Sequence, residues 1–120
     1  PKNGDSVIIN IPEPQIYDVK AENIPLDIVY EDEDIIIINK PQDMAIHPSM
    51  GNHDSTLANA LMYYFKSQNK DFVFRCVNRL DKDTTGLTIV AKHSLSAAIL
   101  GKQITNRQIH RTYLAICEGK

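Results

Sequence analysis

The alternation of hydrophobic and polar residues predicts four short strands. In residues 31–41, four consecutive isoleucines stand between an acidic run and a proline, a pattern typical of a strand covered on both faces. The acidic run, EDED, reads most simply as a solvated turn. Residues 4–14 (GDSVIINIPEP) alternate as a strand does, and residues 12–26 then read as an extended linker. Residues 86–92 (GLTIVAK) and 111–119 (RTYLAICEG) predict the remaining strands.

Two segments have the spacing of helices. Residues 54–68 (DSTLANALMYYFKSQ) place hydrophobic side chains every three or four positions, with Asp54 or Ser55 available as the N-cap. Residues 94–108 (SLSAAILGKQITNRQ) predict a second and less regular helix, because Gly101 lowers helix propensity in its interior. One helix between the strands at 86–92 and 111–117, within a mixed set of elements, predicts an α+β or α/β sheet domain.

The composition is that of a folded domain in a cytoplasmic protein. The 120 residues are 42% hydrophobic and 23% charged, which disfavours wholesale disorder. No apolar run approaches the roughly 20 residues that span a bilayer, and the N-terminus has no signal-peptide pattern. Cys76 and Cys117 stand far apart, so we expect reduced thiols in a cytoplasmic location rather than a disulfide or a metal pair.

Charge divides the chain into two halves. Residues 1–60 contain three lysines and eleven acidic residues, a net charge of −8, and residues 61–120 contain ten cations and four acids, a net charge of +6. Such a division is compatible with a surface that faces a polyanion, and equally with two solvated faces of different charge.

Residues 78–92 (NRLDKDTTGLTIVAK) hold the candidate chemistry, and two general motifs fit them in part. An EF-hand loop starting at Asp81 would need a glutamate at position twelve, where Lys92 stands, so we set the calcium interpretation aside. The DxDxT pattern of Asp81, Asp83 and Thr85 matches a phosphatase signature in which the first aspartate attacks phosphorus with Mg²⁺. That chemistry places the motif at the tip of a hydrophobic strand and requires a later acidic pair, which the chain lacks. A Mg²⁺-dependent phosphatase is therefore the weaker alternative.

A third interpretation rests on several segments in order. NRLDKDTTGL (78–87) resembles the HRLDxxTSGL signature of the RluA/RluD-type RNA pseudouridine synthases, INKPQDMAIHP (38–48) resembles their VNKPxGxxVHP segment, and RTYLA (111–115) resembles KxYxA. Residues 1–14 are similar to the exit of a small S4 RNA-binding domain, and residues 15–120 then correspond to the N-terminal part of the catalytic domain. The resemblance implies an α+β fold with a mixed, mostly antiparallel sheet and flanking helices.

The resemblance also implies roles for three residues. Asp81 is the carboxylate that acts on the target uridine, Arg79 fills the space left by the flipped nucleotide, and Tyr113 stacks on the uracil. An ion pair of Arg79 with Asp81 or Asp83 is the structural alternative for the arginine, and core packing is the alternative for the tyrosine. Thr84, Thr85 and Gly86 suit a tight turn that presents Asp81, with Asp83 capping that turn.

Two substitutions and one absent segment depart from the family pattern. Asn78 and Arg111 replace the usual His and Lys, and a later GRxHQIR-like segment with a basic residue is absent from these 120 residues. We therefore expect a fragment of a larger catalytic unit, inactive by itself. Its expected partner is structured RNA, with ribosomal RNA favoured and transfer RNA the alternative, without a membrane. A non-catalytic RNA-binding module is a further alternative.

No cofactor or metal is implied by the resemblance or by the residues. The four histidines have no metal-ligand spacing, and surface or loop positions are favoured for all of them: His47, His53, His93 and His110.

Overall fold

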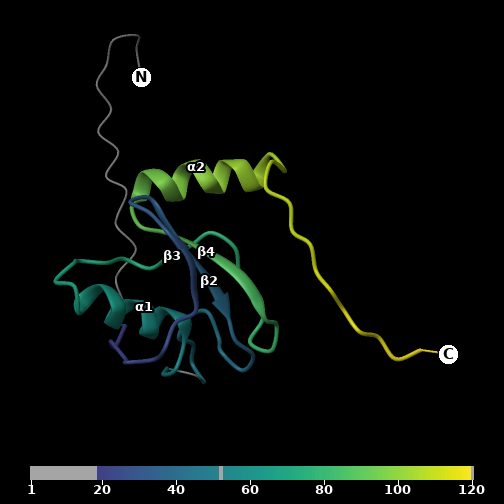
Figure 1. Cartoon of the computed structure of the whole chain (residues 1–120), viewed down its shortest axis with the longest axis horizontal. Helices are drawn as coiled ribbons and strands as arrows, with labels where there is room; N and C mark the ends of the chain where they lie inside the picture. Colours follow the sequence, from purple (N-terminus) through teal and green to yellow (C-terminus); the bar gives the residue numbers. More distant parts are fainter. Residues whose placement is uncertain (1–18, 52, 120) are drawn as a thin grey trace, which may run out of the picture.

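The computed structural model describes residues 19–51 and 53–119, which form a four-stranded antiparallel sheet with a helix on either side (Figure 1). The sheet order is β1-β2-β4-β3, and each neighbouring pair is antiparallel. The elements, in chain order, are β1 (Ile28–Glu31), β2 (Ile35–Lys40), α1 (Leu57–Lys66), β3 (Arg75–Cys76), β4 (Gly86–Ala91) and α2 (Ser94–Thr105).

The core lies between α1 and one face of the sheet. The register pairs Ile36 with Val90 and Ile38 with Thr88, so these four side chains share the face that α1 covers. Helical spacing gives α1 a stripe of buried apolar side chains against this face, formed by Leu57, Leu61 and Phe65.

The opposite face of the sheet is only partly covered. Ile35, Ile37 and Ile89 are half-buried there, and Leu87 is exposed. The predicted coverage of residues 31–41 on both faces is therefore confirmed for the α1 face and only partly met on the other. The α2 helix contacts β4 and β3, which leaves much of β2 open on this side.

Both predicted helices are present, but α1 begins later than its expected caps. Ser55 has a positive φ of 61°, whereas Thr56 is extended and its side chain accepts a hydrogen bond from the Asn59 backbone N–H. The Asn59 side chain returns the contact by accepting from the Thr56 N–H at 3.0 Å, which completes a capping box. Thr56 is therefore the N-cap in place of Asp54 or Ser55.

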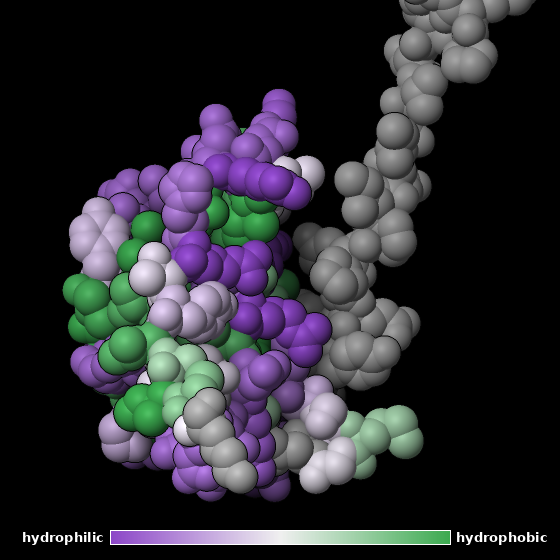
Figure 2. All heavy atoms as spheres, turned by 90° about the vertical axis from the view of Figure 1, so that its right-hand side faces the viewer, coloured by the Kyte–Doolittle hydropathy of each residue, from purple (hydrophilic) through white to green (hydrophobic). Residues whose placement is uncertain are grey.

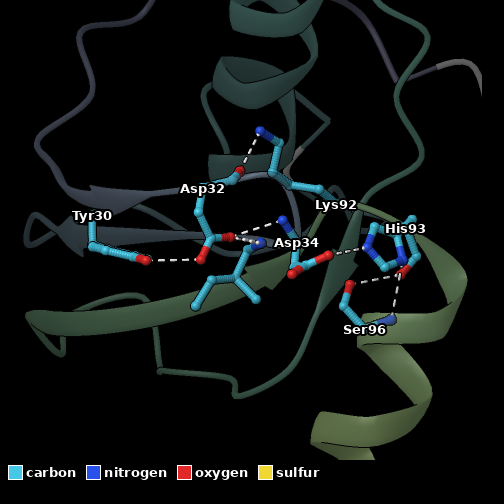
Figure 3. A network of polar contacts seen from close by, with 7 residues as sticks. Tyr30, Asp32, Asp34, Lys92, His93 and Ser96 are labelled. Atoms are coloured by element: carbon cyan, nitrogen blue, oxygen red, sulfur yellow. Dashed lines mark hydrogen bonds and ion pairs between the residues drawn. The ribbon is translucent and has the colours of Figure 1, made fainter.

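The EDED run forms the expected solvated turn and also joins the hairpin to α2 (Figure 3). The Asp32 carboxylate accepts from the backbone N–H groups of Asp34 and Ile35, at 2.8 and 2.9 Å. On the other side of the turn, Asp34 Oδ1 lies 2.7 Å from His93 Nε2. The Nδ1 atom of His93 accepts from the Ser96 N–H at 3.2 Å and so caps the start of α2.

The strand predicted at 111–119 is not formed. Residues 108–119 have neither helix nor strand in the described structure, and this C-terminal segment runs away from the sheet in Figure 1. Residues 111–119 have the alternation of a strand, but a strand also needs a neighbouring backbone. No described residue donates to or accepts from the backbone of residues 109–119. Tyr113 therefore lies outside the sheet.

One predicted strand cannot be compared with the structure, and one observed strand has no counterpart among the predictions. The strand predicted at 4–14 and the first part of the linker lie outside the described residues. The β1 strand (Ile28–Glu31), which follows that linker, was not predicted. None of the described helices has the length and apolar character needed to cross a bilayer.

Candidate active site

The segment that carries Asp81 is a loop between two neighbouring strands. The chain leaves β3 at Cys76 and returns to the sheet at Gly86, the first residue of β4. The Thr84 N–H donates to the Asp81 carbonyl at 3.0 Å and closes a turn over residues 81–84. Gly86 has a φ of +134°, a conformation that favours glycine, so the predicted tight turn ends at a position that a side chain would strain. We call residues 79–85 the Asp81 loop.

A buried lysine from β2 holds the middle of the Asp81 loop. Lys40 is 0% exposed, and its Nζ donates to the carbonyls of Pro41, Met44 and Lys82 at 2.9, 2.8 and 3.1 Å. The Met44 N–H also donates to the Lys82 carbonyl at 3.1 Å. The Lys82 carbonyl therefore joins the Asp81 loop to the segment that follows β2.

Lys40 is also the buried cation of this region. Burial lowers the pKa of Lys40, while the charges of Asp83 and Asp81 act in the opposite direction and favour its protonated form. Its ammonium group contacts carbonyl oxygens only, so its charge is not neutralised by a carboxylate in direct contact within the described structure. The segment INKPQDMAIHP includes this lysine, but neither its burial nor its distant partner at residue 82 follows from the sequence.

The side chains of Arg79 and Asp81 are exposed and form no ion pair with another described residue. Among the salt bridges of the described residues, the loop contributes only Lys82, which pairs with Asp43 at 3.3 Å. The alternative that Arg79 forms an ion pair with Asp81 or Asp83 is therefore wrong for this structure. Asp83, expected to cap the turn, makes no side-chain hydrogen bond with the described residues, so that expectation is also wrong.

His47 packs against Phe74, a placement that the sequence did not predict. Its ring meets Phe74 edge-on with centroids 4.9 Å apart, and the residue is half-buried. Burial lowers the pKa of His47, and the positive charge of Arg79 lowers it further, so the neutral imidazole is favoured. The sequence offers one signal that His47 lies near the site, because His47 belongs to residues 38–48, which resemble VNKPxGxxVHP.

Tyr113 lines a hollow beside the Asp81 loop rather than a pocket around Asp81. The hollow has a volume of about 850 Å³, with Ile37 and Ile89 of the open sheet face on one side and Tyr113 and Leu114 on the other. Asp83 lines it, and Asp81 does not. Tyr113 is 57% exposed, so core packing is excluded for it in this structure. Figure 2 faces the side from which the C-terminal segment extends and shows hydrophobic side chains at the surface among polar ones.

Metal-ligand clusters and paired thiols do not appear among residues 19–51 and 53–119. No three His, Cys, Asp or Glu side chains of these residues are grouped as metal ligands. Cys76 is a free, half-buried thiol and Cys117 a free, exposed one.

Comparison with known proteins identifies the family. The family model described as RNA pseudouridylate synthase matches residues 34–120. Ribosomal large subunit pseudouridine synthase D of Escherichia coli K12 is 46% identical over 116 residues, which cover 97% of this chain and 36% of that protein. An uncharacterised RNA pseudouridine synthase of Aquifex aeolicus is 40% identical over 98% of this chain and 38% of its own length.

A solved structure agrees with the sequence relatives. Human RNA pseudouridylate synthase domain containing 1 superposes with a TM-score of 0.56 at 30% identity, covering 69% of this chain and 29% of the human chain. The chain belongs to the RNA pseudouridine synthase family. It spans little more than a third of the length of the curated relatives it matches.

The family match and the geometry agree against the phosphatase interpretation. Asp81 lies in a loop five residues after the end of β3, instead of at the tip of a hydrophobic strand. The predicted resemblance to RluA/RluD-type enzymes and the α+β fold are confirmed.

Proposed function

We propose that the protein converts specific uridines in RNA to pseudouridine and that Asp81 is the carboxylate that acts on the target nucleotide. The observation that carries the proposal is the presentation of Asp81. Its exposed side chain has no ion-pair partner among the described residues, and its loop is fixed through the Lys82 carbonyl by Lys40 and Met44. A rigidly held and unoccupied carboxylate is what nucleophilic or general-base chemistry requires.

The proposed reaction is an isomerisation. The bond between N1 of uracil and C1′ of the ribose breaks, and a bond between C5 and C1′ forms after the base has turned. The proton on C5 is lost to solvent and N1 gains a proton, so no atom or electron is supplied by a cofactor.

Arg79 and Tyr113 are assigned to binding the substrate. Arg79 is exposed two residues before Asp81, where a planar cation can replace a nucleotide extruded from its stack and contact phosphate. Tyr113 has an exposed ring at the hollow beside the loop, a position from which it can stack on a base.

Large-subunit ribosomal RNA is the proposed substrate. It is supported by two relatives, 46% and 48% identical, that are named ribosomal large subunit pseudouridine synthase D. The net charge of +6 in residues 61–120 adds support, because cations near phosphates provide much of the affinity for RNA. Transfer RNA is the competing substrate in the test below.

Tritium release from RNA labelled at C5 of uridine tests the proposal. The full-length protein that carries this chain should release tritium from large-subunit ribosomal RNA without added metal or cofactor, and less from transfer RNA. Mg²⁺-dependent phosphate release without tritium release would establish a phosphatase instead. RNA binding with neither activity would establish a non-catalytic module.

A further inference from the structure

Asn78 occupies the point at which the chain leaves the sheet to enter the Asp81 loop. Its side-chain Nδ2 donates to the Leu87 carbonyl at 3.1 Å, and its Oδ1 accepts from the Ile89 backbone N–H at 2.7 Å. Since one partner is a backbone acceptor and the other a backbone donor, the orientation of the amide group is set by its partners.

These two bonds continue the ladder between β3 and β4 after the backbone pairing has ended. The backbone pairs are Arg75 with Ala91 and Cys76 with Val90, and the Val77 N–H then donates to the Ile89 carbonyl at 2.8 Å. The Asn78 amide bonds the next backbone groups along β4 and thereby closes the base of the Asp81 loop.

The backbone of Asn78 is fixed as well. Its carbonyl accepts a hydrogen bond from Cys76 Sγ at 2.8 Å. Burial raises the pKa of the Cys76 thiol to about 11, so the thiol keeps its proton and acts as the donor at neutral pH. Both the main chain and the side chain of residue 78 are therefore held where the loop begins.

We propose that Asn78 is a positioning residue for the uridine isomerisation, an inference that rests on the function proposed above. The Asp81 loop has a second tether at the Lys82 carbonyl. Residues 79–81 lie between the two tethers, so the Asn78 amide sets the direction in which Arg79 and Asp81 leave the sheet.

Two substitutions in the full-length protein test the proposal. Asn78→Ala removes both bonds. Asn78→Asp keeps the acceptor for Ile89 but, when ionised, places an oxygen against the Leu87 carbonyl, and only the protonated acid restores a donor there. Asn39→Ala is the matched control, because the Asn39 amide makes an exposed contact with Asp27 at 3.0 Å on another strand.

The kinetic readout separates positioning from binding. Asn78→Ala should lower the single-turnover rate at saturating RNA by about 10- to 100-fold while RNA affinity stays within a few-fold, because a misplaced reacting group costs rate. The rate of Asn78→Asp relative to wild type should rise as the pH is lowered, and Asn39→Ala should match wild type. A wild-type rate for Asn78→Ala, or a pH-independent ratio for Asn78→Asp, would overturn the proposal.

Hydrogen exchange keeps this inference separate from the proposed function. If wild-type protein releases no tritium, the proposed isomerisation fails, and with it the role of Asn78 in that reaction. The structural part is tested independently at the Ile89 amide, which should exchange at least about tenfold faster in Asn78→Ala than in wild type or Asn39→Ala. Unchanged exchange would show that Asn78 does not anchor the loop.

Discussion

The charged residues of the Asp81 loop differ in what they contact. Lys82 is paired with Asp43, whereas Arg79 and Asp81 have exposed side chains outside the ion pairs of the described residues. Satisfied surface charges contribute little to stability or binding, and unpaired ones remain available to a ligand. Arg79 and Asp81, for which the resemblance implies roles toward the nucleotide, are thus exposed and outside these ion pairs, and Asp83 shares that state.

Replacing Arg79 should affect both rate and affinity. Arg79→Ala is expected to slow single-turnover conversion through failed extrusion of the base, and to lower the slope of log affinity against log salt by about one. Lys82→Ala is the control from the same loop, and its conversion rate should stay near wild type because that lysine is already paired. Titration of labelled RNA at several salt concentrations gives the slope. An unchanged rate and slope for Arg79→Ala would exclude it from the RNA interface.

At the scale of elements, the main connection is made by Lys40. It belongs to β2, yet its ammonium group bonds the segment after β2 and the Asp81 loop, which are far apart in sequence. A buried lysine is tolerated here because three carbonyl oxygens replace its hydration. The site therefore depends on a side chain that does not face the substrate surface.

Lys40→Met should destabilise the protein. Methionine fills part of the space but leaves the carbonyls of Pro41, Met44 and Lys82 without this donor, a loss of about 3 kcal/mol in the free energy of unfolding. Urea unfolding of the full-length protein measures it, with Lys66→Met, an exposed residue of α1, as a control expected within about 0.5 kcal/mol of wild type. Equal stability of the Lys40 and Lys66 variants would contradict the assigned role.

Features that depend on residues near one another in the sequence were predicted, and features that depend on partners distant in the sequence were missed. Periodic patterns identified β2, β4 and both helices, because amphipathic spacing depends on neighbouring residues alone. The N-cap was misplaced by one or two positions, since the backbone conformation of Ser55 decides between similar residues. The roles of Lys40 and Asn78 depend on partners in other elements, which no local pattern specifies.

At the scale of the whole molecule, the sheet has one partly open face, and the backbone of residues 109–119 pairs with no strand of the described structure. Ile37 and Ile89 are half-buried and Leu87 is exposed on that face, while Leu114 and Ile116 are each 98% exposed. The residues at 111–119 have the alternation of a strand without its pairing. Family membership was predicted correctly, but the strand was not, because its formation requires a partner that the pattern does not contain.

The 120-residue chain by itself should self-associate and be inactive. Its partly open apolar face, together with the backbone of residues 109–119, which pairs with no described residue, favours contacts between copies. Sedimentation at increasing concentration should show a rising mass, and the double variant Leu114→Asp with Ile116→Asp should associate less. A monomeric chain that unfolds cooperatively and releases tritium from RNA would show this expectation to be wrong.

The most direct test of the central claim compares two carboxylates in the same loop. In the full-length protein, Asp81→Asn should abolish tritium release in single-turnover reactions while RNA affinity stays within a few-fold, because phosphate contacts dominate that affinity. Asp83→Asn should keep most of the activity and cost at most about 1 kcal/mol of stability, since Asp83 makes no side-chain hydrogen bond among the described residues. An active Asp81→Asn protein together with an inactive Asp83→Asn protein would contradict the assignment of Asp81.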